Sequence, residues 1–120
     1  MRVLIIAPYF APNPEVAAVR MVSLSSQLVS DGHAVTVLCL SREGLLRENK
    51  PEELTASVPD GVRTIRFDLD YSTAPLVADY LNGKRFARAL SGLVDPADYD
   101  VVLNTCGPYY PLEAAPIIGR

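Results

Sequence analysis

Four short segments of this chain are apolar over most of their length and alternate with polar or amphipathic stretches. They are RVLIIA (residues 2–7), AVTVLCL (34–40), VRTIRF (62–67) and DVVLNT (100–105). Each is rich in β-branched residues and bounded by turn-forming residues, which predicts β-strands. Three are almost wholly apolar, as expected of strands covered on both faces, whereas residues 62–67 alternate and predict an edge strand.

The stretch between the first two predicted strands has helical spacing. One apolar stripe recurs every three or four residues and consists of Ala17, Met21, Leu24 and Leu28. Asn13 is a favourable N-cap, Pro14 suits the first helical position, and Gly32 can adopt the left-handed conformation that ends a helix. A strand, a helix and a second strand in succession predict a βαβ unit with a right-handed crossover.

The second half of the chain gives weaker signals. Residues 41–60 are charged and punctuated by proline, which predicts a solvated connection with one helical turn at residues 51–54. Helical spacing returns at residues 75–94. Asn82 and Gly83 interrupt this pattern, so we expect a break there and the better helix over residues 84–94.

The alternation of strands and helices predicts an α/β fold with an open, doubly wound, mostly parallel sheet and the strand order 3-2-1-4. Ligands of such sheets bind beyond the carboxyl ends of the strands, at the point where the strand order reverses. Here that point lies between the first and fourth strands. The loops PYFAPNPEV (residues 8–16) and CGPYYP (106–111) are therefore expected to meet there.

Both loops are rich in proline and aromatic residues. Proline orders a loop at low entropic cost, and tyrosine offers a flat apolar face with a hydroxyl at its tip, which suits a sugar ring. The alternative is that these aromatic side chains anchor the loops or pack against another domain. The candidate substrate-binding residues are Tyr9, Phe10, Asn13, Glu15, Val16, Arg20, Thr105, Tyr109 and Tyr110.

Several common kinds of site lack their sequence signals. The first glycine after the first strand is Gly32, so the glycine-rich turn of a dinucleotide site is missing, and no P-loop motif occurs. The helix N-terminus near residues 14–16 can still hold a diphosphate through its free N–H groups. The net charge of −3 provides no broad basic surface for nucleic acid.

Cysteine and histidine usage argues against a metal centre. Cys39 and Cys106 lie in or at the end of predicted strands, without the spacing of metal ligands, so we expect two reduced thiols that are not bonded to each other. The strand order would also place one strand between them, too far for a disulfide. His33 lies at the turn entering the second strand, on the opposite edge from the ligand loops, and is expected to cap or pack.

The chain also lacks a membrane-spanning signal at its start. The apolar run before Pro8 is shorter than a signal-peptide core, so we expect a cytoplasmic protein. Lys84, Arg85 and Arg88 form either a solvated helix face or a contact with anionic lipid headgroups at the inner membrane face.

The segment RVLIIAPYFAPNPEVAAVRMVSLSSQLVSDGHAVTVLCL resembles the start of a retaining glycosyltransferase of the large GT-B family 4. The likeness is to the subgroup in which a YFxPE loop replaces the commoner glycine pair and an arginine follows in the first helix. The motifs DGHAVTVL, DGVRTIRF and YDVVLNTCGPYY occur in the family's order and spacing. The resemblance covers essentially the whole chain.

The resemblance implies that residues 1–120 form an incomplete N-terminal, Rossmann-like domain that receives the acceptor. A C-terminal domain, absent here, would bind the nucleotide sugar, with neither a cofactor nor a metal required. The loop at Asn13 would lie near the donor phosphates or the acceptor, and Arg20 would point into the cleft between the domains. Catalytic residues of the N-terminal domain would lie mostly beyond Arg120.

Three functions therefore remain open. The chain is part of a hexosyltransferase that moves sugar to a lipid-linked or cell-surface glycan precursor and is inactive alone, or it is the acceptor-binding subunit of a split glycosyltransferase. The third alternative is an α/β ligand-binding module without transfer chemistry. A domain without its partner would expose apolar groups and self-associate, and the candidates for such a surface are Tyr109, Tyr110, Pro111, Ile117 and Ile118.

Overall fold

The computed structural model describes residues 1–12, 16–46, 50, 52, 54, 57–68 and 77–105. Its elements in chain order are β1 (Arg2–Ile6), α1 (Val16–Ser30), β2 (Ala34–Leu40), α2 (Arg42–Leu46), β3 (Val62–Phe67), α3 (Ala78–Leu93), the 3₁₀ helix η2 (Pro96–Asp98) and β4 (Val101–Asn104). Predictions made for Asn13, Glu15, Cys106 and the segment from Tyr109 to Ile118 fall outside the described residues.

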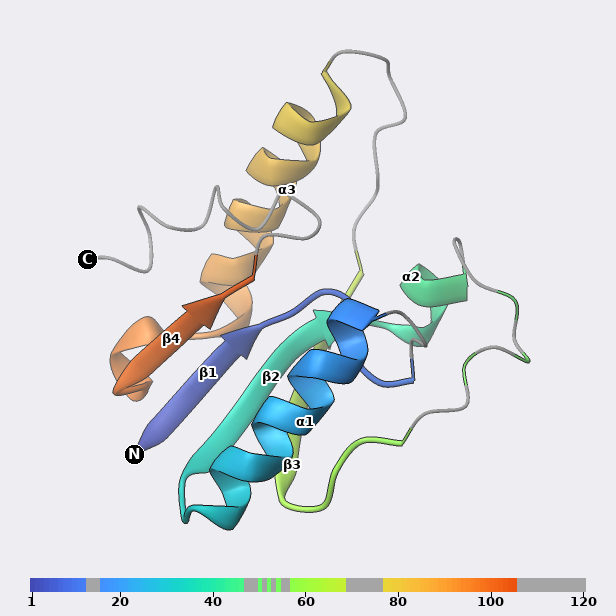
Figure 1. The fold of residues 1–120 in the computed structure, drawn as a ribbon. Helices are drawn as coiled ribbons and strands as arrows, with labels where there is room; N and C mark the ends of the chain where they lie inside the picture. The colour runs from blue at the N-terminus through green and yellow to red at the C-terminus, as the bar shows by residue number, and fades with distance from the viewer. Residues whose placement is uncertain are drawn as a thin grey trace.

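The four described strands form one parallel sheet with the order β3-β2-β1-β4, which confirms the predicted fold class and strand order (Figure 1). In register, Val3 of β1 lies beside Val35 of β2 and Val101 of β4. Among these strands β3 is at an edge, as its alternating pattern predicted.

Helix α1 covers one face of the sheet, over β2 and β3 (Figure 1). The strand residues on this face include Val3, Ile5, Val35, Val37 and Cys39, all of which are buried. Because side chains alternate along a strand, the residues between them point to the other face of the sheet. Burial of both faces is why these strands are continuous apolar runs.

Helix α3 packs on the opposite face through Phe86 and Leu90, which contact the cluster that contains Leu4, Leu38 and Phe67. The rings of Phe67 and Phe86 are tilted at 58° with their centroids 5.3 Å apart, a favourable edge-on arrangement. The sheet therefore has a helix on each face, as a doubly wound fold requires.

The buried face of α1 differs from the predicted stripe. Ala18 and Ser25 are the fully buried residues of this helix, whereas Ala17 is exposed and Leu24 is 36% exposed. The face is rotated by about one residue from the predicted one, because the helix sits over β2 and β3 and leaves its flank toward β4 partly uncovered. Of the predicted stripe, Met21 and Leu28 still pack against the core cluster, whereas Ala17 and Leu24 are exposed.

The C-terminus of α1 matches its sequence signal. Gly32 has a φ of +90°, and its N–H donates to the carbonyl oxygen of Val29 at 3.0 Å. The N–H of His33 donates to the carbonyl oxygen of Leu28, also at 3.0 Å. This pair of hydrogen bonds is the Schellman motif, which favours glycine at the left-handed position.

Helix α3 does not break at Asn82 and Gly83, and this prediction was wrong. Both residues lie inside the continuous helix and are buried. An internal glycine costs a helix about 1 kcal/mol relative to alanine, less than the several kcal/mol gained by burying side chains such as Phe86 and Leu90. Lys84, Arg85 and Arg88 are exposed on this helix, as both of their predicted alternatives require.

Residues 41–60 are not simply a solvated connection. A short helix, α2, follows β2, and the side chains of Leu45 and Leu54 are buried in the cluster beneath α3. These two leucines anchor the segment to the core, although its charges and prolines predicted a solvated connection. Of the turn predicted at residues 51–54, only Glu52, which is 3₁₀-helical, and Leu54 are described.

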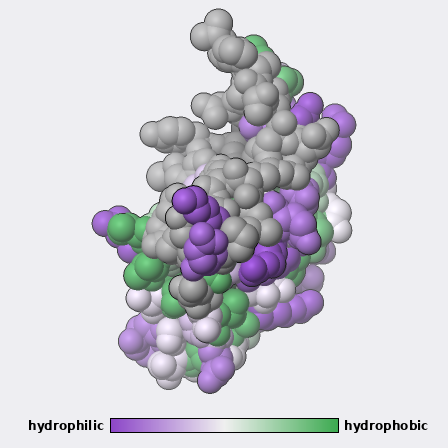
Figure 2. Space-filling view, turned by 90° about the vertical axis from the view of Figure 1, so that its right-hand side faces the viewer, coloured by the Kyte–Doolittle hydropathy of each residue, from purple (hydrophilic) through white to green (hydrophobic). Residues whose placement is uncertain are grey.

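The exterior is mixed in polarity. Figure 2 looks onto the side of the molecule that carries β3 and α2, and hydrophilic residues lie there beside small apolar areas. Within the described residues, no helix combines the length and the apolar character needed to cross a bilayer.

Candidate functional site

Two neighbouring strands end side by side at the carboxyl edge of the sheet. Ile6 of β1 pairs with Asn104 of β4, and the next residue, Thr105, donates its backbone N–H to the carbonyl oxygen of Ile6 at 3.1 Å. Since β2 and β4 lie on opposite sides of β1, this is the point where the strand order reverses. In a doubly wound sheet it is the expected ligand position.

A small pocket of about 130 Å³ lies at this point. Its lining residues come from the segment after β1, from the first turns of α1 and from the residue after β4, and they are Tyr9, Ala17, Arg20, Met21 and Thr105. The fold thus brings together three residues that the sequence nominated separately, Tyr9, Arg20 and Thr105. Ala17 and Met21 were assigned to a core stripe and were missed as pocket residues.

Arg20 supplies the charge of the pocket. Its side chain is exposed on α1, and it makes no hydrogen bond or ion pair with any described residue. A guanidinium group carries five N–H donors in a planar fork that matches carboxylate and phosphate oxygens. Arg20 is therefore available to bind an anion that enters the pocket.

Thr105 supplies a fixed hydroxyl. Its Oγ1 donates to the carbonyl oxygen of Ile6 at 2.8 Å, which holds the side chain against the end of β1. With its proton committed, the hydroxyl oxygen can accept a hydrogen bond from a ligand. A ligand hydroxyl is a suitable donor.

Tyr9 forms the wall between the pocket and the core. It is half-buried and packs against the cluster beneath α3. A tyrosine anchored in this way offers a rigid, partly apolar surface to a ligand.

The remaining nominated residues fall into two groups. Phe10 is fully buried in the cluster beneath α1, so it belongs to the core and does not line the pocket. Its aromatic character reflected packing, the alternative given for the loop. Val16 is the first residue of α1 and is 68% exposed, outside the pocket lining. Asn13, Glu15, Tyr109 and Tyr110 lie outside the described residues.

Arg66 on β3 also contributes to this edge and was missed from the sequence. Its Nη1 donates to the carbonyl oxygen of Leu40 at 2.9 Å and its Nη2 to that of Ala11 at 2.7 Å. The side chain thus connects the end of β2 and the edge strand to the loop that carries Tyr9. A polar residue inside an edge strand was the only sequence signal.

Metal-binding chemistry has no support among the described residues, which contain no group of three histidine, cysteine or acidic side chains placed to share an ion. Cys39 is buried and free, so its predicted unbonded state is confirmed. Burial raises the pKa of its thiol to about 11, only partly countered by the charge of Arg66. A thiol of that kind is a poor nucleophile or metal ligand.

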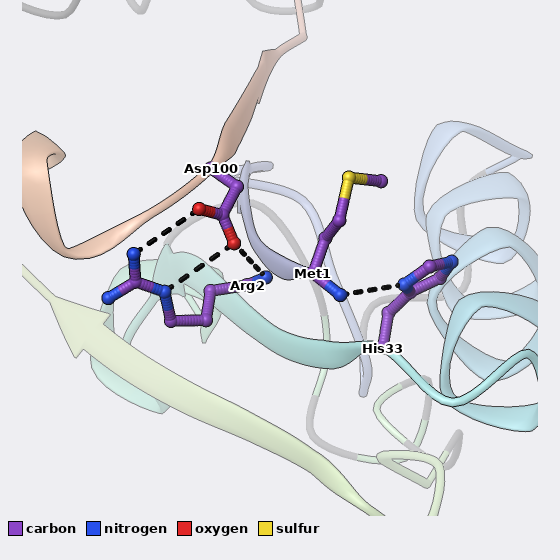
Figure 3. A network of polar contacts seen from close by, with 4 residues as sticks. All are labelled: Met1, Arg2, His33 and Asp100. Carbon is purple, nitrogen blue, oxygen red and sulfur yellow. Dashed lines mark hydrogen bonds and ion pairs between the residues drawn. The ribbon is translucent and has the colours of Figure 1, made fainter.

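A separate polar network lies at the amino edge of the sheet (Figure 3). The backbone N–H of Arg2 donates to Oδ2 of Asp100 at 2.7 Å, and its Nη2 donates to Oδ1 at 3.2 Å. The backbone N–H and the guanidinium of Arg2 lower the pKa of Asp100. Nδ1 of His33 lies 3.1 Å from the terminal amino group of Met1. His33 is thus at the edge opposite the pocket, where the sequence predicted it.

The fold and the position of the pocket define a Rossmann-like α/β protein with a small cationic pocket at the switch point of its parallel sheet. No protein-family model, no curated protein and no solved structure matches this chain.

Proposed function

We propose that this chain is the acceptor-side, Rossmann-like part of a GT-B glycosyltransferase, which transfers a hexosyl unit from a nucleotide sugar to a glycan or lipid-linked acceptor. The observation that carries the proposal is the convergence of Tyr9, Arg20 and Thr105 on one pocket at the switch point. The sequence resemblance supplies the reaction class, and the pocket chemistry is compatible with it.

Each of the three side chains suits one part of a glycosyl-transfer substrate. The guanidinium of Arg20, which has no partner among the described residues, complements a phosphate group. The Tyr9 ring gives a surface for the apolar face of a sugar, and the Thr105 oxygen accepts from a sugar hydroxyl. In the reaction these groups bind and orient, and Arg20 offsets negative charge on the leaving diphosphate.

The size of the pocket favours a shared site. Complete small-molecule sites usually enclose about 300–1,000 Å³, whereas this pocket encloses about 130 Å³. That volume accommodates a phosphate or part of one sugar ring. We expect a donor-binding domain, on the same polypeptide or on a partner subunit, to close the remainder, and the 120-residue chain to be inactive alone.

The test is a transfer assay on the protein encoded by the whole reading frame, or on this chain with its donor-binding subunit. Arg20→Gln should lower kcat/KM for the nucleotide sugar by roughly tenfold to a hundredfold, because a hydrogen bond to a charged group contributes about 1.5–3 kcal/mol. The matched control is Arg88→Gln, which removes the same charge from an exposed position on α3 and is assayed with a water-soluble acceptor, so that no lipid contact is involved. It should leave kcat/KM unchanged.

Two outcomes would contradict the proposal. Wild-type transfer by Arg20→Gln would remove the pocket from the mechanism even if the enzyme class were right. Binding of a nucleoside diphosphate without any sugar transfer, by the complete protein, would instead favour a non-catalytic ligand-binding module.

A further inference from the structure

A second and larger hollow opens at the amino edge of the sheet, at the opposite end of the strands from the pocket of Arg20. It encloses about 350 Å³, within the usual size range of small-molecule sites. Its lining residues are Arg2, Ala34, Val35, Thr36, Gly61, Arg63, Asp98 and Tyr99. Nothing in the proposed glycosyl transfer uses these residues.

The hollow exists because the core on this face changes character toward the amino edge. Leu4 and Leu38 face α3 and are fully buried. Two residues earlier on the same strands, on the same face, stand Arg2 and Thr36. The floor of the hollow is therefore polar and lies next to the apolar core on the same face of the sheet. Asp98 of η2 and the next residue, Tyr99, form one wall.

Arg63 adds a second cation to the lining, which also contains the carboxylate of Asp98. It is exposed on β3, with Thr36 as its register partner on β2, and it makes no hydrogen bond or ion pair with any described residue. Thr36 is 8% exposed, a buried polar residue in an otherwise apolar strand. Together they present a cation and a hydroxyl to the same space.

Arg2 can act with Arg63. Its Nε donates to Oδ2 of Asp100 at 3.5 Å and its Nη2 donates to Oδ1 at 3.2 Å. Figure 3 shows the third guanidinium nitrogen turned away from that carboxylate. The exposed ion pair favours this orientation of the guanidinium, which reduces the cost of ordering its remaining donors for a ligand.

The wall from η2 adds a different chemistry. Asp98 offers carboxylate oxygens that accept hydrogen bonds, and Tyr99 offers a half-buried ring. A simple anion would be repelled by the carboxylate of Asp98. A small anion that also carries hydroxyl groups would use the cations, the acceptor and the ring together.

We propose that this hollow is a binding site for a hydroxylated small anion, a sugar phosphate or a sugar acid. The anionic group lies between Arg63, Thr36 and the outward nitrogen of Arg2. The hydroxyl groups donate to Asp98, and the sugar ring packs on Tyr99. This site is separate from the pocket of Arg20, and it would stand if the glycosyltransferase assignment failed.

The test is a titration of the 120-residue chain followed by amide NMR shifts, with glucose 6-phosphate, glucuronate, inorganic phosphate and glucose as separate probes. The first two distinguish a phosphate from a carboxylate source. Saturable shifts are expected at Thr36 and Gly61 with at least one of them, with weaker binding of phosphate and none of glucose. Shifts centred on Thr105 instead would report the other pocket.

Two variants make the assignment specific. Arg63→Gln should weaken binding at least tenfold, and Thr36→Val, which keeps the shape and removes the hydroxyl, should also weaken it. Arg88→Gln should bind as wild type. Three results would overturn the proposal. One is that neither sugar anion saturates the site by about 10 mM, which is weaker than the binding of most specific ligands. The others are that phosphate binds as tightly as glucose 6-phosphate, or that Arg63→Gln binds the sugar anion as tightly as wild type.

Discussion

The guanidinium of Arg66 donates a 2.7 Å hydrogen bond to the carbonyl oxygen of Ala11, 55 residues earlier in the chain. Its other terminal nitrogen donates to the carbonyl oxygen of Leu40 at 2.9 Å. One side chain on the edge strand thus satisfies two loop-end carbonyl groups, which need partners when they are withdrawn from water. This contact helps to hold the loop after β1, which carries Tyr9 into the pocket, together with the hydrogen bond from the N–H of Leu40 to the carbonyl oxygen of Pro8.

Replacing Arg66 by methionine should destabilise the fold. Because a hydrogen bond to a charged group contributes about 1.5–3 kcal/mol, Arg66→Met should lower the free energy of unfolding by about that amount in urea denaturation. Arg63→Met is the control, since Arg63 lies on the same strand without a described partner, and it should change stability by less than about 0.5 kcal/mol. Equal effects of the two substitutions would show that the Arg66 contacts do not stabilise the loop.

Two glycines with positive φ, Gly32 and Gly61, allow the cost of backbone strain to be measured separately from the cost of a steric contact. Gly61 has a φ of +83°, and a Cβ there would lie 2.8 Å from Cγ1 of Val29. Gly32 has a φ of +90° but no atom within 4 Å of such a Cβ. Gly32→Ala should therefore cost only the left-handed conformation, about 1–2 kcal/mol, and Gly61→Ala should cost more.

The same pair can be tested in a Val29→Ala background. Removal of the valine methyl groups should bring the cost of Gly61→Ala down toward that of Gly32→Ala, as measured by thermal or urea unfolding. An unchanged difference would mean that the contact with Val29 is not its cause.

Cys39 should react slowly with thiol reagents in the native state. Its side chain is buried and its pKa is raised to about 11, so little thiolate exists at pH 8 and little of it is accessible. Alkylation with iodoacetamide, located by peptide mass spectrometry, should modify Cys39 only after unfolding in urea. Rapid native labelling at this position would contradict the described core.

The pair formed by Arg2 and Asp100 predicts a pH dependence of stability. The pKa of Asp100 is lowered in the folded chain, first by the backbone N–H of Arg2 and then by its guanidinium. A carboxyl group with a lowered folded pKa stabilises the fold above its unfolded pKa of about 3.9, and this contribution is lost as the pH falls through the folded value.

Asp100→Asn should accordingly lower Tm slightly at pH 7, and the difference from wild type should shrink as the pH falls below about 4. The pair is exposed, so added salt should reduce the part due to the guanidinium. A Tm difference that stays constant from pH 7 to pH 2 would assign the effect to shape rather than to charge.

The sequence by itself determined the sheet. Apolar runs that alternate with helical or long connecting segments favour parallel strands with crossovers, and the right-handedness of those crossovers limits the possible orders, so 3-2-1-4 could be predicted from the sequence. The left-handed conformation at Gly32 could also be predicted from the sequence, because it depends only on local backbone geometry. The position of the pocket followed from the strand order.

Tertiary structure decided what depends on contacts between distant segments. Phe10 and Tyr9 are neighbours in one loop, yet Phe10 is fully buried and Tyr9 lines the pocket. The difference arises because α1 covers the side of the loop that carries Phe10. Arg66 and Arg63 both occupy an edge strand, but within the described part of the chain only Arg66 donates to carbonyl groups. Periodicity specifies which residues share a face, whereas burial and hydrogen bonding depend on what the rest of the chain places against that face.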